Sequence, residues 1–410
     1  MKRLYSLDIY RGTMIILVIV LHRFLYDWTK TEDFFLSEQP WFDYPWITLF
    51  MIFVAMGSIF TLITGIVTAY STYGRASSNK SKMKTLVWGS LVMLIWLALV
   101  TILVKYFFDM RHHIRGEFYY GLYTGWLRSR TFHTPGLEIF LLASSTLIII
   151  GISGFVVTAL LALMFRNDGI KKVRRNKNIF GLLGVIILAL SAFLPYIFIP
   201  MMYDAFDNGN YVLALVLALL VADYFPIFPI LGFAFFGAVM GLQLAAGEDQ
   251  KKISNYWLKF CLIIIIIGIV LVAISISQGL FNFNFIRFIQ LGFYFFIIVI
   301  LLKTFDFQTE EKLEKRVRKT TPLLRLGRVS LTIFVFETVI AATINFFIID
   351  YLIPGWKNNI LFILLIGVLN LALWWVLLIY WEKKNFKGSI EWIGTQLVKK
   401  ITGKSTNKVK

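Results

Sequence analysis

Long apolar runs alternate with short polar segments along almost the whole chain. A helix that crosses the hydrocarbon core of a bilayer needs about 20 mainly apolar residues. Ten runs satisfy this requirement and predict membrane-spanning helices: 9–29, 46–70, 85–107, 137–165, 179–201, 226–246, 258–278, 286–302, 330–350 and 359–381. The pattern therefore predicts an all-α polytopic membrane protein. Residues 1–382 form its transmembrane domain, and residues 383–410 form a basic cytoplasmic tail.

A shorter apolar run, YVLALVLALLVA, covers residues 211–222. Asp223, Pro226 and Pro229 separate it from the next run, and proline interrupts helices. We interpret it as a half-helix or re-entrant element, because a full span here would place the basic stretch KTFDFQTEEKLEKRVRK outside. Ten spans are expected, with eleven as the alternative.

Composition and charge agree with a membrane protein. The chain is 58% hydrophobic and only 16% charged, with a net charge of +18. A basic chain can bind nucleic acid, but Lys and Arg also collect in cytoplasmic loops of membrane proteins. With the N-terminus inside, most of the 41 Lys and Arg residues fall on the inner side, in 71–84, 166–178, 248–257, 303–329 and the tail from 382. We expect a multi-pass protein of a prokaryotic cell membrane, with both termini cytoplasmic, a lipid bilayer as partner and no nucleic acid. A homodimer stays open.

The first apolar run contains ionisable residues that share a face. Arg11 and His22 are eleven residues apart, which separates them by about 20° around a helix and roughly 16 Å along it. An ionisable side chain inside a membrane usually faces a cavity or a partner. Arg23 can either extend outward to water or pair with Asp27, four residues on. His22 is thus a candidate catalytic residue, with a hydrogen bond that only joins helices as the alternative.

The segment FDMRHHIRGEFYYGLYTGWLRSRTFHTPG, residues 108–136, is an exception to the charge rule, since it falls outside. Arginines among aromatic rings suit an anionic, sugar-like ligand. An aromatic belt at the membrane interface is the alternative. The candidate substrate-binding residues are Arg111, His112, His113, Arg115, Arg128 and Arg130, and His133 is a second catalytic candidate.

Several stretches resemble one family. SLDIYRG…LHRFLYDW resembles the first helix of the heparan-alpha-glucosaminide N-acetyltransferase catalytic family, and the acyltransferase-3 membrane proteins share a similar Arg-to-His spacing. Four further stretches resemble later elements of that family, in the same order: PWITLFMIFVAMGSIFTLITG, FHTPGLEIF, ILGFAFFGAVMGLQLA and LGRVSLTIFVFE. One residue departs from the family pattern, because Glu337 stands where the family often has a histidine.

The resemblance implies acyl transfer across a membrane, from cytosolic acetyl-CoA as cosubstrate to a sugar or glycan acceptor on the opposite side. No permanently bound cofactor or metal is expected. Arg11 and Arg328 would hold the phosphates of acetyl-CoA, although Arg328 also fits the positive-inside pattern. Asp8 would cap the first helix or pair with Arg11. His22 would act as general base or nucleophile, with Asp27 and Glu337 as further members of the catalytic site.

Two other functions fit the same sequence. An acyltransferase-3-like O-acyltransferase of surface glycans or lipids would share Arg11 and His22 with the first hypothesis. A secondary transporter would also use ten spans, a broken helix and intramembrane His and Glu residues, but the two halves of the chain show no internal repeat. The change at Glu337 also leaves open a fold whose chemistry has been lost.

Overall fold

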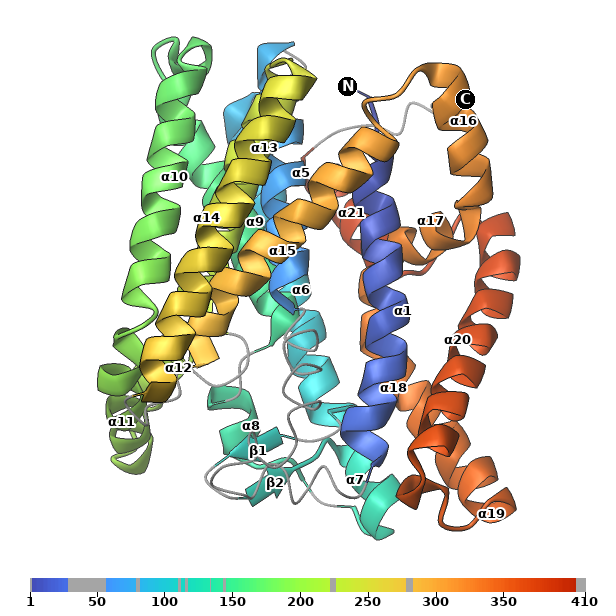
Figure 1. Ribbon diagram of the computed structural model, residues 1–410. Coiled ribbons are helices and arrows are strands. Elements are labelled where there is room, and N and C mark those ends of the chain that lie inside the picture. Colours follow the sequence, from blue (N-terminus) through green and yellow to red (C-terminus); the bar gives the residue numbers. More distant parts are fainter. Residues whose placement is uncertain are drawn as a thin grey trace.

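The chain folds into a bundle of long helices with one small hairpin at one end (Figure 1). The computed structural model describes residues 2–28, 57–78, 82–109, 112–114, 117–132, 134–142, 145–221, 226–277 and 283–402. The termini of the described chain lie at the end opposite the hairpin (Figure 1). The helical architecture expected from the sequence is confirmed.

The first part of the chain contains α1 and the elements from α5 to α12. Its elements are α1 (Tyr5–Asp27), α5 (Gly57–Ser77), α6 (Met83–Phe107), β1 (His112–Ile114), β2 (Glu117–Tyr119), α7 (Leu122–Ser129), α8 (Leu137–Leu141), α9 (Thr146–Met164), the 3₁₀ turn η1 (Gly169–Lys171), α10 (Val173–Leu190), α11 (Leu194–Asp207) and α12 (Tyr211–Val221). The two strands pair antiparallel, with His112 opposite Tyr119. The short apolar helix expected at 211–222 is α12.

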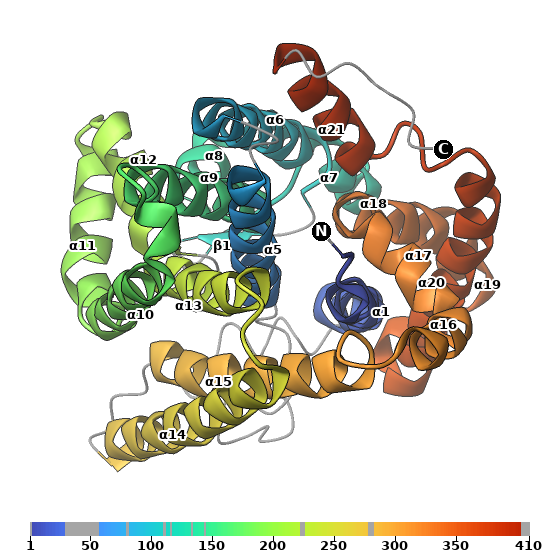
Figure 2. The ribbon, with the colours of Figure 1, turned by 90° about the horizontal axis from the view of Figure 1, so that it is seen from above.

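The second part completes the bundle. Its elements are α13 (Ile227–Ala245), α14 (Gln250–Ser277), α15 (Phe283–Thr304), α16 (Glu310–Lys319), α17 (Thr321–Arg328), α18 (Ser330–Ile344), the π-helical turn η2 (Asn345–Ile349), α19 (Asp350–Leu352), the 3₁₀ turn η3 (Trp356–Asn358), α20 (Ile360–Lys383) and α21 (Ile390–Ile401). Seen from above, α15, α17, α18 and α20 lie around α1 (Figure 2).

Among the described residues, seven helical segments are long and apolar enough to cross a membrane. They are Met83–Phe107, Leu137–Met164, Ile227–Ala245, Gln250–Ser277, Asn284–Thr304, Ser330–Leu352 and Ile360–Lys383. A bent pair, α10 with α11, makes an eighth if it is counted as one span. The expected count of ten therefore stays a prediction. Helix α1, with its charged residues, is not among the seven, and part of the expected span 46–70 lies outside the described residues.

The span expected at 179–201 is not one straight helix. The chain bends by 65° between α10 and α11. Pro195 stands at the start of α11, where its missing N–H costs nothing, but a helix continuing from α10 would need that N–H as a donor. Proline therefore favours a new helix at this point.

Helix α1 is packed very closely against α17. A Cβ atom added to Gly12 would lie 2.0 Å from the Leu323 carbonyl oxygen, and one added to Gly327 would lie 2.0 Å from that of Asp8. Small residues let membrane helices approach in this way. The backbone of α1 is consequently held directly against its neighbour.

A remote carboxylate caps the beginning of α1. Asp306, in the loop after α15, accepts hydrogen bonds from the backbone N–H groups of Tyr5 at 2.9 Å and Ser6 at 3.0 Å. Burial raises the pKa of Asp306, and these hydrogen bonds oppose that shift. The capping role considered for Asp8 is thus performed by Asp306, and no side chain caps the helix locally.

A second remote carboxylate caps α18. Glu391 of α21 accepts hydrogen bonds from the N–H groups of Leu331 at 2.7 Å and Thr332 at 3.3 Å, and from the Thr332 hydroxyl at 2.6 Å. Burial raises the pKa of Glu391. Helix α21 also packs on α6, where the Trp96 indole donates to the Ile390 carbonyl at 3.1 Å. The basic tail segment is therefore attached to the bundle at its first turn.

Candidate functional site

His22 meets Glu337 inside the bundle, between α1 and α18. The His22 Nδ1 atom and the Glu337 Oε1 atom form a short hydrogen bond or ion pair. Glu337 is completely buried and His22 is 17% exposed. Thr338 donates its hydroxyl to the same carboxylate oxygen, and the Tyr26 ring lies 5.2 Å from the imidazole, centroid to centroid. The histidine therefore has a fixed carboxylate partner on another helix.

Arg23 and Asp27 extend this cluster. Arg23 is completely buried and pairs with Asp27 at 3.0 Å and with Glu337 at 3.8 Å. The Asn345 amide donates to Asp27 at 3.2 Å, from the first residue of η2. Of the two alternatives for Arg23, the structure has the pair with Asp27. One buried cation thus lies between two buried carboxylates.

Some atoms of the cluster lack hydrogen bonds to other described residues. They are Arg23 Nε and Nη2, Glu337 Oε2 and Asn345 Oδ1. A buried polar group without a hydrogen bond is destabilising, so such groups cluster where water or a ligand completes the bonding. The 3.8 Å between Arg23 Nη2 and Glu337 Oε2 exceeds direct hydrogen-bond distance. This cluster has spare hydrogen-bonding capacity for a polar ligand.

The contact between His22 and Glu337 fixes the chemistry of the imidazole. Where Glu337 is a carboxylate it can only accept, and Nδ1 is then the nitrogen that carries the proton. The opposite nitrogen, Nε2, is then unprotonated in the neutral ring. This arrangement suits a general base or nucleophile oriented by a carboxylate. Asp27 does not serve His22 in this way, since it contacts Arg23 and Asn345.

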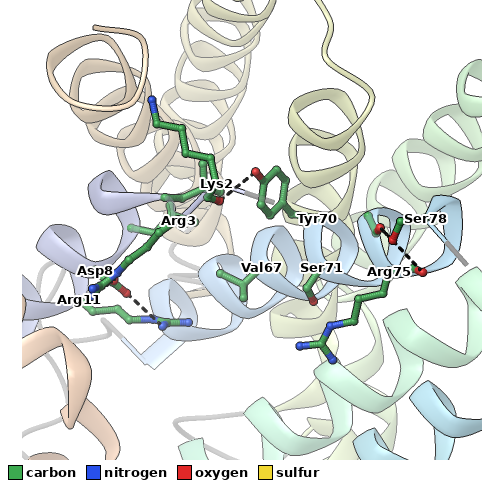
Figure 3. A pocket seen from close by; sticks show the side chains of 12 residues that line it. Lys2, Arg3, Asp8, Arg11, Val67, Tyr70, Ser71, Arg75 and Ser78 are labelled. Atoms are coloured by element: carbon green, nitrogen blue, oxygen red, sulfur yellow. Dashed lines mark hydrogen bonds and ion pairs between the residues drawn. The ribbon is translucent and has the colours of Figure 1, made fainter. Parts of the chain in front are cut away.

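A basic pocket of about 470 Å³ lies near the first turns of α1 (Figure 3). Its polar and charged lining residues are Lys2, Arg3, Asp8 and Arg11 from the N-terminal side and Tyr70, Ser71, Arg75 and Ser78 from the α5 side. Four cations and one carboxylate give this wall a formal charge of +3. Such a surface suits a ligand that carries phosphates.

Asp8 organises the cations on one side of the pocket. It accepts from Arg3 Nε at 2.7 Å and lies 3.8 Å from Arg11, as the sequence suggested for Asp8 and Arg11. Arg328 is not among the residues that line this pocket. It lies 3.5 Å from Glu382 of α20, which also binds Arg325 at 2.6 Å. The pocket thus contains Arg11 and Asp8 of the expected phosphate site, without Arg328.

The expected acceptor segment lies at the other end of the bundle, around the hairpin and α7 (Figure 1). Arg128 lies over the Tyr120 ring at 5.1 Å, and Arg130 over the Phe346 ring at 3.6 Å. Trp126 stacks on Phe132 at 5.7 Å. Arg111, Arg115 and His133 lie outside the described residues, and only the backbone of His112 and His113 is described. The described part of the segment therefore provides arginines and aromatic rings.

Sequence reasoning missed Arg75, Tyr70 and Asn345. Arg75 ends α5 in a basic loop, where the positive-inside pattern alone explains an arginine. Asn345 begins a π-helical turn, a geometry frequent at functional sites, but no sequence pattern announces such a turn. No protein-family model and no curated protein sequence matches this chain.

Proposed function

We propose that the protein transfers an acetyl group from acetyl-CoA to an amine or hydroxyl of a sugar or glycan on the other side of a membrane. The observation that carries this proposal is the contact between His22 and Glu337. His22 belongs to α1, and the first turns of the same helix line the cationic pocket. The resemblance of the first helix to the heparan-alpha-glucosaminide N-acetyltransferase family supports the same chemistry.

The basic pocket would receive the donor. The end of the bundle with the N-terminus faces the cytoplasm in this proposal, as the distribution of basic loops favours. Lys2, Arg3, Arg11 and Arg75 would bind the phosphates of CoA. The rest of the thioester would then extend along α1 toward His22, roughly 16 Å further along the helix.

The transfer itself would use the unprotonated Nε2 of His22. The nitrogen takes the proton of the acceptor N–H or O–H while the acceptor attacks the thioester carbonyl. The bond from the acyl carbon to sulfur breaks, the new amide or ester bond forms, and the imidazolium gives its proton to the departing CoA thiolate. Glu337 stabilises the imidazolium, and Arg23, held by Asp27, lies beside that carboxylate.

The acceptor would enter from the hairpin end. The rings of Trp126 and Phe132 offer a stacking surface for a sugar, and Arg128 and Arg130 offer charge for an anionic group. Helix α7, which carries Trp126 and Arg128, lies at the end of the bundle opposite the first turns of α1 (Figure 1). Donor and acceptor would thus approach the His22 site from opposite membrane faces.

The purified protein tests this proposal directly. It is incubated with acetyl-CoA and either glucosamine-type amines or hydroxyl sugars, and both free CoA thiol and acetylated product are measured. We expect thiol release that depends on acceptor, and a loss of at least about 100-fold in His22→Ala. Thr13→Ala on the same helix is the control, because its hydroxyl donates to the Ile9 carbonyl of its own helix at 3.1 Å. Unchanged turnover in His22→Ala would exclude the mechanism.

The buried cluster also favours a second candidate, a proton-coupled secondary transporter. Buried His, Glu, Asp and Arg side chains in a membrane protein often mark a proton pathway. Reconstituted vesicles separate the two functions. Proton-coupled uptake without thioester cleavage would favour transport, whereas stoichiometric release of CoA and acetylated acceptor would favour the enzyme.

A further inference from the structure

A second pocket, of about 460 Å³, lies between α18 and α20, away from both sites described above. It is lined by Thr332, Phe336 and Ile340 of α18, by Trp374, Leu377, Tyr380 and Trp381 of α20, and by Lys384 and Gly388 of the following loop. We call it the α18–α20 groove. It runs from the loop before α21 toward the middle of both helices.

The walls of this groove are apolar and partly exposed. Tyr380 is 64% exposed, Leu377 42% and Phe336 36%. Both α18 and α20 belong to segments apolar enough to cross a membrane, so these side chains would contact lipid. Trp and Tyr side chains are typical of the level where a bilayer meets water. Acyl chains are therefore the natural neighbours of the groove.

The rim of the groove is cationic. Lys384 lines the groove, and its neighbours in the chain, Lys383 and Lys387, are exposed as it is. The nearby carboxylate, Glu382, does not neutralise them, because it binds Arg325 at 2.6 Å and Arg328 at 3.5 Å. The Trp381 indole donates to the Lys387 carbonyl at 2.9 Å and thereby holds the loop against α20. Since Lys383 lies over the Tyr380 ring at 5.4 Å, the rim presents the exposed amines of Lys384 and Lys387 on a backbone that this hydrogen bond holds in place.

We propose that the α18–α20 groove binds an anionic phospholipid, with an acyl chain along Phe336, Ile340 and Leu377 and the headgroup phosphate at Lys384 and Lys387. A zwitterionic lipid would fill the same apolar walls without using the rim charge. A soluble peptide would not match walls that face the bilayer interior. The combination of apolar walls and uncompensated amines fits an anionic lipid of the leaflet on the N-terminal side.

The bound lipid would contact the junction that holds α21. Thr332 lines the groove, donates to Glu391 at 2.6 Å and accepts from the Ile390 N–H at 2.8 Å. Glu337 lies on the same helix, five residues further on. Occupancy should therefore increase the thermal stability of the full chain.

Native mass spectrometry of the full-length protein with phosphatidylglycerol or phosphatidylcholine tests the proposal. Wild type should retain phosphatidylglycerol in preference to phosphatidylcholine. Its melting temperature should be higher with phosphatidylglycerol than with phosphatidylcholine. Each lysine near an anionic surface contributes roughly fivefold in affinity, so the double variant Lys384→Glu/Lys387→Glu should lose at least about 25-fold. Lys312→Glu/Lys315→Glu on α16 makes the same charge change away from the groove and should retain the lipid.

Leu377→Trp separates the groove from the surface charge. Its exposed position tolerates a larger side chain, which would fill the groove and remove lipid retention while leaving the rim lysines intact. Equal retention of both lipids by wild type, or unchanged phosphatidylglycerol retention in Leu377→Trp, would overturn the proposal. A dimer that covers α20 in the absence of lipid would overturn it as well.

Discussion

Replacing Glu337 by Gln removes one charge from the buried cluster and changes little else. The amide has nearly the same shape, and its oxygen can still accept from His22 Nδ1. Arg23 keeps its 3.0 Å partner Asp27, so the variant leaves a balanced ion pair where wild type has one cation and two carboxylates. The substitution therefore tests the charge on Glu337 rather than the fold.

The size of the effect follows from the geometry. Opposite unit charges 3.8 Å apart, the separation of Arg23 and Glu337, attract by about 4 kcal/mol at an effective dielectric constant of 20. His22 Nδ1 lies closer to Glu337 than Arg23 does, so an imidazolium formed in the proposed transfer would be stabilised at least as much. About 4 kcal/mol corresponds to roughly a thousandfold in rate.

The assay is acceptor-dependent release of CoA thiol, with kcat and KM measured separately. For Glu337→Gln we expect kcat to fall by about 100- to 1,000-fold, the range of a general base that has lost its partner. The KM for acetyl-CoA should stay within about twofold, because the donor pocket is roughly 16 Å away along α1. Glu337→Asp keeps the charge and should lose less. A Glu337→Gln protein with more than half of the wild-type kcat would refute this reasoning.

Three further predictions concern the donor pocket, helix packing and pH. Arg75→Glu should raise the KM for acetyl-CoA about tenfold or more, since a charge-assisted phosphate contact is replaced by repulsion, whereas Arg166→Glu outside the pocket should not. Gly12→Ala should destabilise the protein by about 1–3 kcal/mol in thermal or denaturant unfolding through its 2.0 Å clash, whereas Gly181→Ala, with open space around it, should not. Because burial raises the pKa of Glu391, the folded protein holds that proton more tightly than the unfolded chain, and stability should fall as pH rises from about 4.5 through the folded pKa. Glu391→Gln should remove this part of the pH dependence of the melting temperature, and identical slopes for both proteins would contradict it.

The sequence predicts which ionisable residues of α1 share a face, but it does not predict which residues of other helices they contact. The period of a helix is enough to put Arg11 and His22 on one face, and the high energy of a buried carboxylate is enough to require a partner for Glu337. The structure pairs this carboxylate with both His22 and Arg23. Residues more than 300 positions apart meet through tertiary packing, for which local sequence carries no signal.

The caps and the bend show the same limit. A cap is recognisable when it directly precedes a helix, but Asp306 and Glu391 reach helix ends from other parts of the chain. Pro195 explains the bend before α11, but this proline lies inside a continuous apolar run. A prediction from hydrophobicity alone therefore treats the two helices as one span. Length and composition therefore identify apolar helices in this chain, but not where one helix ends and the next begins.

The attachment of α1 fixes the distance between the basic pocket and the His22 cluster. Asp306 fixes its first N–H groups, Gly12 and Gly327 hold it against α17, and Arg23 with His22 joins it to α18. A helix fixed at both ends cannot slide, so the spacing between Arg11 and His22 is set by the helical rise alone. In the proposed function, that spacing would select a donor whose phosphates and reactive carbonyl are separated by a comparable length. A shortened thioester lacking the phosphate-bearing part should therefore lose binding while its carbonyl chemistry at His22 is unchanged.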